Sequence, residues 1–485
     1  MAVLSELEPK RVFHYFEEIS NIPRGSYHEN AISDYLVSFA KERQLEVYQD
    51  SLYNVIMFVP ASKGYEQEEP VILQGHMDMV CEKTKDASID MEKEGLTLCV
   101  DDQYVFAKDT TLGGDDGIAV AYMLAIAENE EIAHPPLELV ITVCEEVGME
   151  GASGIDLSML KGKRMLNLDS EEEGVFLSSC AGGISLHSKL PVSYEEVSDL
   201  CWYTISISGL LGGHSGCEIH KERANANQLL GRLLFEINKN MKVYICAMDG
   251  GKKDNAIPLE ANVKLGIDPS DYKLLEHTIE QVQQIFKTEY SQSDPGIVIT
   301  SEECENANAF VLKQRDMEHV IHLLMTLPNG VCGMSMSMPG LVETSLNLGV
   351  MKLCDEYLFL QHSIRSSVTS KKYFVANQVE CLVRSFGGTV ERKGDYPAWE
   401  YKEESVVRPR VIALYEKMYG KKPTVEGIHA GLECGLLAGK IADLDCVAMG
   451  PDILDIHTTA ERLDIASTKR VYEFLLEYLK MKDLN

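Results

Sequence analysis

Acidic and imidazole side chains recur in this sequence at the points where short apolar runs end. VILQG at 71–75 continues into His76 and Asp78, LELVITVC at 137–144 into two glutamates, and RMLNL at 164–168 into an aspartate. Apolar runs of about 4–8 residues between turn signals predict buried strands. The carboxyl ends of strands in an open parallel sheet line one crevice. We therefore expect six side chains to meet there: His76, Asp115, Glu145, Glu146, Asp169 and His457.

This set of side chains favours metal chemistry. Taken alone, an HxD, DD or EE motif is typical of a loop or a solvated turn. Several carboxylates in one crevice, however, would be costly to bury without a cation. Two histidines and several carboxylates, with no cysteine among them, suit Zn²⁺ or Mn²⁺ and match a two-metal hydrolytic site. Asp78 lies two residues after His76, so the two side chains face the same side of the chain.

The elements that must position these residues alternate over the first 180 or so positions between helical and strand patterns. This alternation predicts an α/β layer. Ser26 to Glu29 reads as a capping box before an amphipathic helix, and the stretch 117–128 is apolar on nearly all sides, as in a buried helix.

The pattern changes near Gly182, where strands and helices follow one another in an order that then repeats weakly up to about residue 395. The α/β pattern returns after a polar segment at 392–405 that suits a hinge. We therefore predict an α/β catalytic domain with a largely parallel sheet flanked by helices, interrupted by an inserted α+β lid domain of doubled size. The predicted bounds are 1–183 and 398–485 for the two parts of the catalytic domain and 184–397 for the lid.

Composition excludes some partners. The 485 residues carry 45 Lys and Arg against 76 Asp and Glu, a formal charge of −31, which disfavours nucleic acid and membrane surfaces. No apolar run approaches the roughly 18 residues of a membrane span.

The first 20 residues lack the pattern of a signal peptide, and the 13 cysteines are scattered without a CxxC pair. We expect free thiols and a cytoplasmic protein.

Five motifs resemble those of the M20 metallopeptidases, in the same order and with similar spacing. They are HMD at 76–78, GGDDG at 113–117, EEVGMEG at 145–151, the strand end at Asp169 and GGHSG at 212–216. The sequence LGGDDGIA, the doubled lid and the late segment GPDILDIHT are most similar to the aminoacyl-histidine dipeptidase branch of that family. The resemblance extends over essentially the whole chain.

This resemblance implies a pair of divalent ions, Zn²⁺ in the first place, with Mn²⁺ or Co²⁺ as alternatives. His76 and Asp169 would hold one ion, Glu146 and His457 the other, and Asp115 would bridge the two. All five are His, Asp or Glu side chains, which are common ligands of such ions.

The resemblance also implies roles for four further residues. Asp78 would bond the far nitrogen of His76, and Glu145 would be the general base that deprotonates a metal-held water. In the lid, His214 would support the oxyanion and Arg365 would pair with the C-terminal carboxylate of the substrate.

The function implied is a dipeptidase that cleaves Xaa-His and a broad range of other dipeptides, so the expected partner is a small peptide. A homodimer formed through the lid is compatible with the sequence.

One alternative is an amidohydrolase of the same fold that acts on another substrate, as an aminoacylase, deacetylase or tripeptidase does. A second is a non-catalytic metal-binding protein, against which the presence of Glu145 argues. Motifs of serine hydrolases, HExxH metalloproteases and nucleotide-binding proteins are absent from the sequence.

Overall fold

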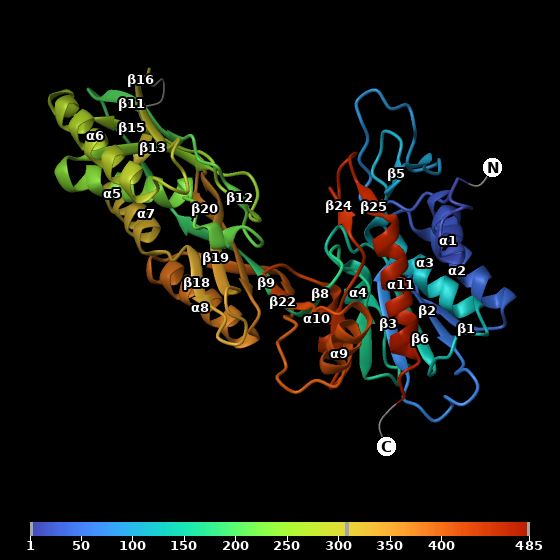
Figure 1. The fold of residues 1–485 in the computed structure, drawn as a ribbon. Helices are drawn as coiled ribbons and strands as arrows, with labels where there is room; N and C mark the ends of the chain where they lie inside the picture. The colour runs from blue at the N-terminus through green and yellow to red at the C-terminus, as the bar shows by residue number, and fades with distance from the viewer. Residues whose placement is uncertain (1–2, 306–309, 483–485) are drawn as a thin grey trace. The chain divides into compact units, whose positions relative to one another are not determined.

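An eight-stranded sheet forms the centre of the first of two units into which the chain divides (Figure 1). The computed structural model describes residues 3–305 and 310–482. Unit 1 consists of Met1–Ser179, Tyr401–Gly427 and Leu432–Asn485, and unit 2 of Cys180–Glu400 and Ile428–Gly431. The strands of the sheet in unit 1 are, in spatial order, β1 (Glu46–Gln49), β2 (Val55–Val59), β6 (Leu137–Thr142), β3 (Val71–His76), β7 (Arg164–Asn167), β23 (Asp445–Ala448), β8 (Val175–Cys180) and β22 (Thr424–Ile428).

The four central strands β6, β3, β7 and β23 run parallel to one another. This confirms the predicted α/β class with a mostly parallel sheet. The strand β2 differs from its neighbours, because it runs antiparallel to both β1 and β6 although its sequence is equally apolar. A small antiparallel sheet lies beside this core, with strands β4 (Leu98–Val100), β5 (Tyr104–Ala107), β24 (Ile453–Leu454) and β25 (Arg462–Asp464).

Helices cover both faces of the central sheet. One face packs, through side chains such as Leu73 and Leu139, into a core shared with five helices. These are α1 (Lys10–Ser20), α2 (Asn30–Glu42), α3 (Gly114–Glu128), α9 (Val407–Tyr419) and α11 (Ile465–Leu479). Because side chains alternate along a strand, Gln74 and His76 point to the opposite face, where α10 (Glu433–Lys440) contacts β23 and the short helix α4 (Glu150–Gly154). The helix expected at 117–128 is α3, which is buried on nearly all sides.

Unit 2 is an α+β unit built on a nine-stranded antiparallel sheet. Four helices lie on one face of this sheet and form its core (Figure 1). The strands are β16 (Val298–Glu303), β11 (Cys201–Ser208), β15 (Ala261–Ile267), β13 (Val243–Gly250), β19 (Val342–Leu353), β20 (Tyr357–Ser366), β9 (Gly182–Pro191) and β21 (Thr389–Tyr396), with β18 (Gly330–Met334) paired to β19. The helices are α5 (Ala226–Asn240), α6 (Tyr272–Glu289), α7 (Gln314–Thr326) and α8 (Thr369–Ser385).

The remaining elements of unit 2 are short. They are the strand pairs β10 (Tyr194–Glu196) with β17 (Phe310–Leu312) and β12 (Gly213–His214) with β14 (Ala256–Ile257), and the 3₁₀ turns η1 (Ile219–Lys221) and η2 (Pro269–Asp271). Among the described residues of both units, no helix is long and apolar enough to cross a membrane.

Candidate metal centre

The five predicted ligands lie in one cluster within unit 1, and Asp115 is at its middle. One oxygen of Asp115 is 3.0 Å from His76 Nε2, and the other is 3.1 Å from His457 Nε2. His76 Nε2 is also 3.7 Å from a carboxylate oxygen of Asp169. His457 Nε2 is 3.0 Å from Glu146. Asp115 therefore stands between two histidines, each of which has a second carboxylate of its own.

Strand register explains why three segments meet at this place. His76 ends β3, and its partner across the ladder to β6 is Thr142, so the two glutamates that follow β6 emerge beside it. On the other side of β3, Gln74 pairs with Asn167, and Asp169 follows β7 two residues later. In parallel strands the carboxyl ends lie at the same edge, as the sequence pattern predicts.

The other two segments are brought in by connections rather than by the parallel strands. His457 lies in the loop between β24 and β25, which form a hairpin. Asp115 lies at the start of α3, and the peptide bond that joins it to Asp116 is cis. The carboxylate of Asp116 accepts a hydrogen bond of 3.1 Å from the backbone of His76. It reaches that position past Gly75, where a Cβ atom would lie 2.3 Å from the Asp116 oxygen.

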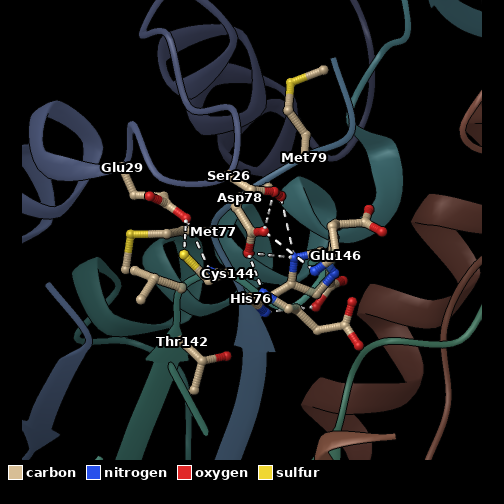
Figure 2. A network of polar contacts seen from close by, with 12 residues as sticks. Ser26, Glu29, His76, Met77, Asp78, Met79, Thr142, Cys144 and Glu146 are labelled. Atoms are coloured by element: carbon tan, nitrogen blue, oxygen red, sulfur yellow. Dashed lines mark hydrogen bonds and ion pairs between the residues drawn. The ribbon is translucent and has the colours of Figure 1, made fainter. Parts of the chain in front are cut away.

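Asp78 contacts His76 and the backbone of both glutamates (Figure 2), and it belongs to neither of the two groups of donor atoms that could hold a metal ion among the described residues. Its Oδ1 is 3.3 Å from His76 Nδ1, and it accepts hydrogen bonds from the backbone N–H of Glu145 at 3.0 Å and of Glu146 at 3.4 Å. Burial alone would raise the pKa of the Asp78 carboxyl, but the bonds from His76, Glu145 and Ser26 lower it overall. Asp78 is therefore an ionised acceptor that can orient the His76 ring.

The capping box expected at Ser26–Glu29 is wrong. The helix α2 begins at Asn30 with no side-chain cap. Ser26 Oγ donates to Asp78 at 2.8 Å, and Glu29 accepts from the backbone N–H of Cys144 at 2.9 Å (Figure 2). Both side chains thus support the ends of β3 and β6 instead of the helix.

His214 and Arg365 belong to unit 2 and lie near each other there. His214 Nδ1 accepts hydrogen bonds from the backbone N–H groups of Gly216 and Cys217, at 3.2 and 3.1 Å, so the proton of the neutral ring is on Nε2. Burial, with a smaller effect from the charge of Arg365, lowers the pKa of His214. Arg365 donates to the Tyr396 hydroxyl at 3.0 Å. Unit 2 thus holds a neutral imidazole donor and a guanidinium.

Three comparisons with known proteins agree with the motifs. The chain is 36% identical to the cytosol non-specific dipeptidase of Escherichia coli over 482 residues, which is 99% of either chain. The crystal structure of aminoacylhistidine dipeptidase from Vibrio alginolyticus matches with a TM-score of 0.94 and 34% identity, over 99% of this chain and 98% of that one. The peptidase M20 dimerisation domain matches residues 205–294. The chain belongs to the M20 metallopeptidase family.

This membership confirms the resemblance and makes the chain a metal-dependent hydrolase by family. A more distant structure, aminopeptidase PepT from Bacillus cereus, shares the M20 fold at a TM-score of 0.56 and 16% identity, with 98% of each chain covered.

The electrostatics of the cluster fit the metal centre of an M20 enzyme. Burial raises the pKa of Glu145 to about 8, and the charges of Glu433 and Glu146 add to the effect. Burial, followed by the charge of Asp116, also raises the pKa of Asp169 well above its ordinary value. Carboxylates crowded in this way are stabilised in their ionised form by divalent cations. Imidazole and carboxylate donors suit Zn²⁺ or Mn²⁺.

The geometry offers two overlapping sets of donor atoms. In each set the atoms lie within 4.8 Å of one another: His76, Asp115 and Glu146 in one, and His76, Asp116 and Asp169 in the other. Asp116 is a candidate donor that the sequence pattern does not predict. Its position directly after Asp115 was the available signal, but neighbouring residues in an extended chain point in opposite directions.

Two further residues that hold the Asp115 loop were also missed. The Glu461 carboxylate accepts hydrogen bonds from the backbone N–H groups of Leu112, Gly113 and Gly114, at 2.8, 3.1 and 2.8 Å. The buried guanidinium of Arg24 donates to the carbonyls of Met77 at 3.0 Å and Asp78 at 3.3 Å, and to that of Gly113. Glu461 follows His457 by four residues, which is a weak signal, whereas nothing near Arg24 in the sequence points to this site.

Proposed function

We propose that this protein hydrolyses dipeptides with the aid of two divalent metal ions held by His76, Asp115, Glu146, Asp169 and His457. The observation that carries the proposal is that these five side chains form one cluster, in which Asp115 lies between His76 and His457 and each histidine contacts a second carboxylate. The similarity of the chain, end to end, to a non-specific dipeptidase and to an aminoacylhistidine dipeptidase supports dipeptides, including Xaa-His, as the substrates.

The reaction would begin with a water molecule. When bound, the pair of ions would acidify this water and polarise the peptide carbonyl. Glu145 would take the proton of the water and then return it to the leaving amine. Asp78 would keep the His76 ring in the tautomer and orientation that a ligand needs, a role supported by its contact with Nδ1.

Unit 2 would act as the lid and bind the rest of the substrate. His214 would donate from Nε2 to the developing oxyanion, which its accepted bonds at Nδ1 support. Arg365 would pair with the free C-terminal carboxylate in a bidentate manner. A free carboxylate close to the scissile bond distinguishes a dipeptide from a longer peptide or an amidated one.

Zn²⁺ is our first choice of metal, with Mn²⁺ and Co²⁺ as the alternatives. The match to the peptidase M20 dimerisation domain supports a homodimer. The similarity to a dipeptidase named for the cytosol supports a cytoplasmic location.

The test combines metal analysis with hydrolysis assays on the full chain. We expect close to two divalent ions per chain, cleavage of dipeptides, loss of activity with a chelator, and recovery with Zn²⁺, Mn²⁺ or Co²⁺. N-acetylated amino acids and tripeptides serve as comparison substrates. Faster turnover of either would assign the chain to an aminoacylase or tripeptidase activity, and full activity in metal-free protein would refute the metal mechanism.

A further inference from the structure

A buried carboxyl that is not among the candidate ligands lies against the strands that carry the metal centre. Glu433 is the first residue of α10 and has no exposed surface. Its Oε2 accepts a hydrogen bond of 2.5 Å from the Gln74 side-chain amide and one of 2.6 Å from the Thr142 hydroxyl. Its Oε1 has no hydrogen-bond partner among the described residues.

Each partner lies just before a residue of the metal centre. Gln74 precedes His76 by two positions in β3, and Thr142 is the ladder partner of His76 and precedes Glu145 by three positions. Gln74 also accepts a 2.7 Å hydrogen bond from Asn167, which precedes Asp169 by two positions in β7. One chain of hydrogen bonds thus crosses the three neighbouring strands β6, β3 and β7 directly before the ends that supply ligands and base.

Burial of the Glu433 carboxyl costs free energy of folding that packing alone does not require. A buried carboxyl loses its hydration, and burial raises the pKa of Glu433 to about 7 although the charge of His76 opposes the shift. A methionine at this position would fill similar space without that cost. The side chains of Gln74 and Thr142, which contact Glu433, and of Asn167, which contacts Gln74, are also fully buried, so each of them needs the bonds that the network provides.

We propose that Glu433 is a positioning residue of the metal centre: as a shared acceptor for Gln74 and Thr142, it fixes the relative positions of the strand ends that carry His76, Glu145 and Asp169. This inference rests on the proposed function, because it assumes that these strand ends bind the metal ions. Groups behind the ligands commonly change metal affinity or activity by about 10- to 100-fold when they are removed.

The test is the substitution Glu433→Met in the full chain, compared with Glu433→Gln. The amide oxygen of glutamine can accept both hydrogen bonds, whereas methionine accepts neither. We expect Glu433→Met to bind Zn²⁺ at least tenfold more weakly in competition with a chromophoric chelator. We also expect kcat on a dipeptide at saturating metal to fall at least tenfold, with KM changed by less than threefold. Glu433→Gln should restore both quantities to within about threefold of the wild type.

Glu138→Met is the matched control. Glu138 is also a buried carboxylate, and it lies in β6, but it accepts from the backbone of Lys161 and Gly162 at the amino end of the strands. It should alter stability without altering Zn²⁺ affinity. Folded Glu433→Met with wild-type affinity and kcat would overturn the proposal, as would a Glu433→Gln variant as impaired as Glu433→Met.

If Glu433→Met does not fold, Thr142→Val decides. It removes one bond to Glu433 at almost constant volume and should weaken Zn²⁺ binding several-fold; unchanged binding would overturn the proposal. Wild-type protein that neither binds metal nor cleaves dipeptides would instead refute the proposed function. The two failures are therefore distinguishable.

Discussion

His362 is a fully buried histidine in β20 whose ring nitrogens both lack a hydrogen-bond partner among the described residues. Its ladder neighbours, Leu348 in β19 and Leu186 in β9, belong to the core of unit 2. Burial lowers the pKa of this imidazole from 6.5 to about 3. We predict that His362→Leu stabilises unit 2 and makes its stability less dependent on pH.

The size of the effect follows from proton linkage. Above pH 6.5 the ring is neutral in both the folded and the unfolded chain, so the pH has little influence. Below pH 6.5 the His362 ring is protonated in the unfolded chain, whereas in the folded chain it stays neutral down to about pH 3. Each pH unit in this window lowers the free energy of unfolding by about 1.4 kcal/mol, and the loss between pH 7 and pH 4.5 is about 2.5 kcal/mol. At pH 7 the leucine should add about 1–3 kcal/mol by removing unsatisfied polar atoms.

Urea unfolding followed by tryptophan fluorescence measures the stability of unit 2. The only two tryptophans of the sequence, Trp202 and Trp399, both belong to this unit. The free energies of unfolding of the wild type and of His362→Leu would be compared at pH 7 and pH 4.5. His277→Leu, at an exposed position of α6, is the control and should keep the wild-type pH dependence. The reasoning is refuted if His362→Leu loses as much stability between the two pH values as the wild type does.

Three further predictions concern the reaction. Glu145→Gln should keep the metal content while kcat falls by about 10²–10⁴, whereas Glu146→Gln should lower the metal content as well. If the two variants behave identically in both assays, the roles assigned to this pair are wrong. Amidation of a dipeptide's C-terminus should reduce kcat/KM at least tenfold, and Arg365→Ala should erase most of this difference between the free and the amidated dipeptide. Tyr396→Phe should have a smaller effect, because the Tyr396 hydroxyl only orients the guanidinium. His214→Ala should lower kcat more than it raises KM, and a change confined to KM would exclude a role at the oxyanion.

Much of the candidate metal centre can be predicted from the sequence because its parts are encoded locally. A short apolar run between turn signals, such as VILQG at 71–75, favours a buried strand, and the residue that follows such a strand lies at its carboxyl end. Three such runs in a parallel sheet deliver His76, Glu146 and Asp169 to one edge, as the structure has it.

Other features depend on partners that are distant in the sequence, and no local pattern reveals them. The direction of β2 depends on its neighbours in the sheet, since parallel and antiparallel strands of this length have the same apolar sequence. Ser26 and Glu29 have the spacing of a helix cap, but the strand ends beside them offer buried partners that a solvated cap does not.

The amino-acid sequence by itself therefore determined which side chains could bind metal and on which strand ends they lie. The family resemblance implied the place of Asp115 between His76 and His457, but what holds Asp115 there is visible only in the tertiary structure, because Glu461 binds the Asp115 loop from the other end of the chain. The tertiary structure also decided that Glu433 is buried against the strands of the metal centre. The physical reason is the same in both cases: whether a polar side chain is desolvated, and which group compensates it, is a property of the packed structure and not of local sequence.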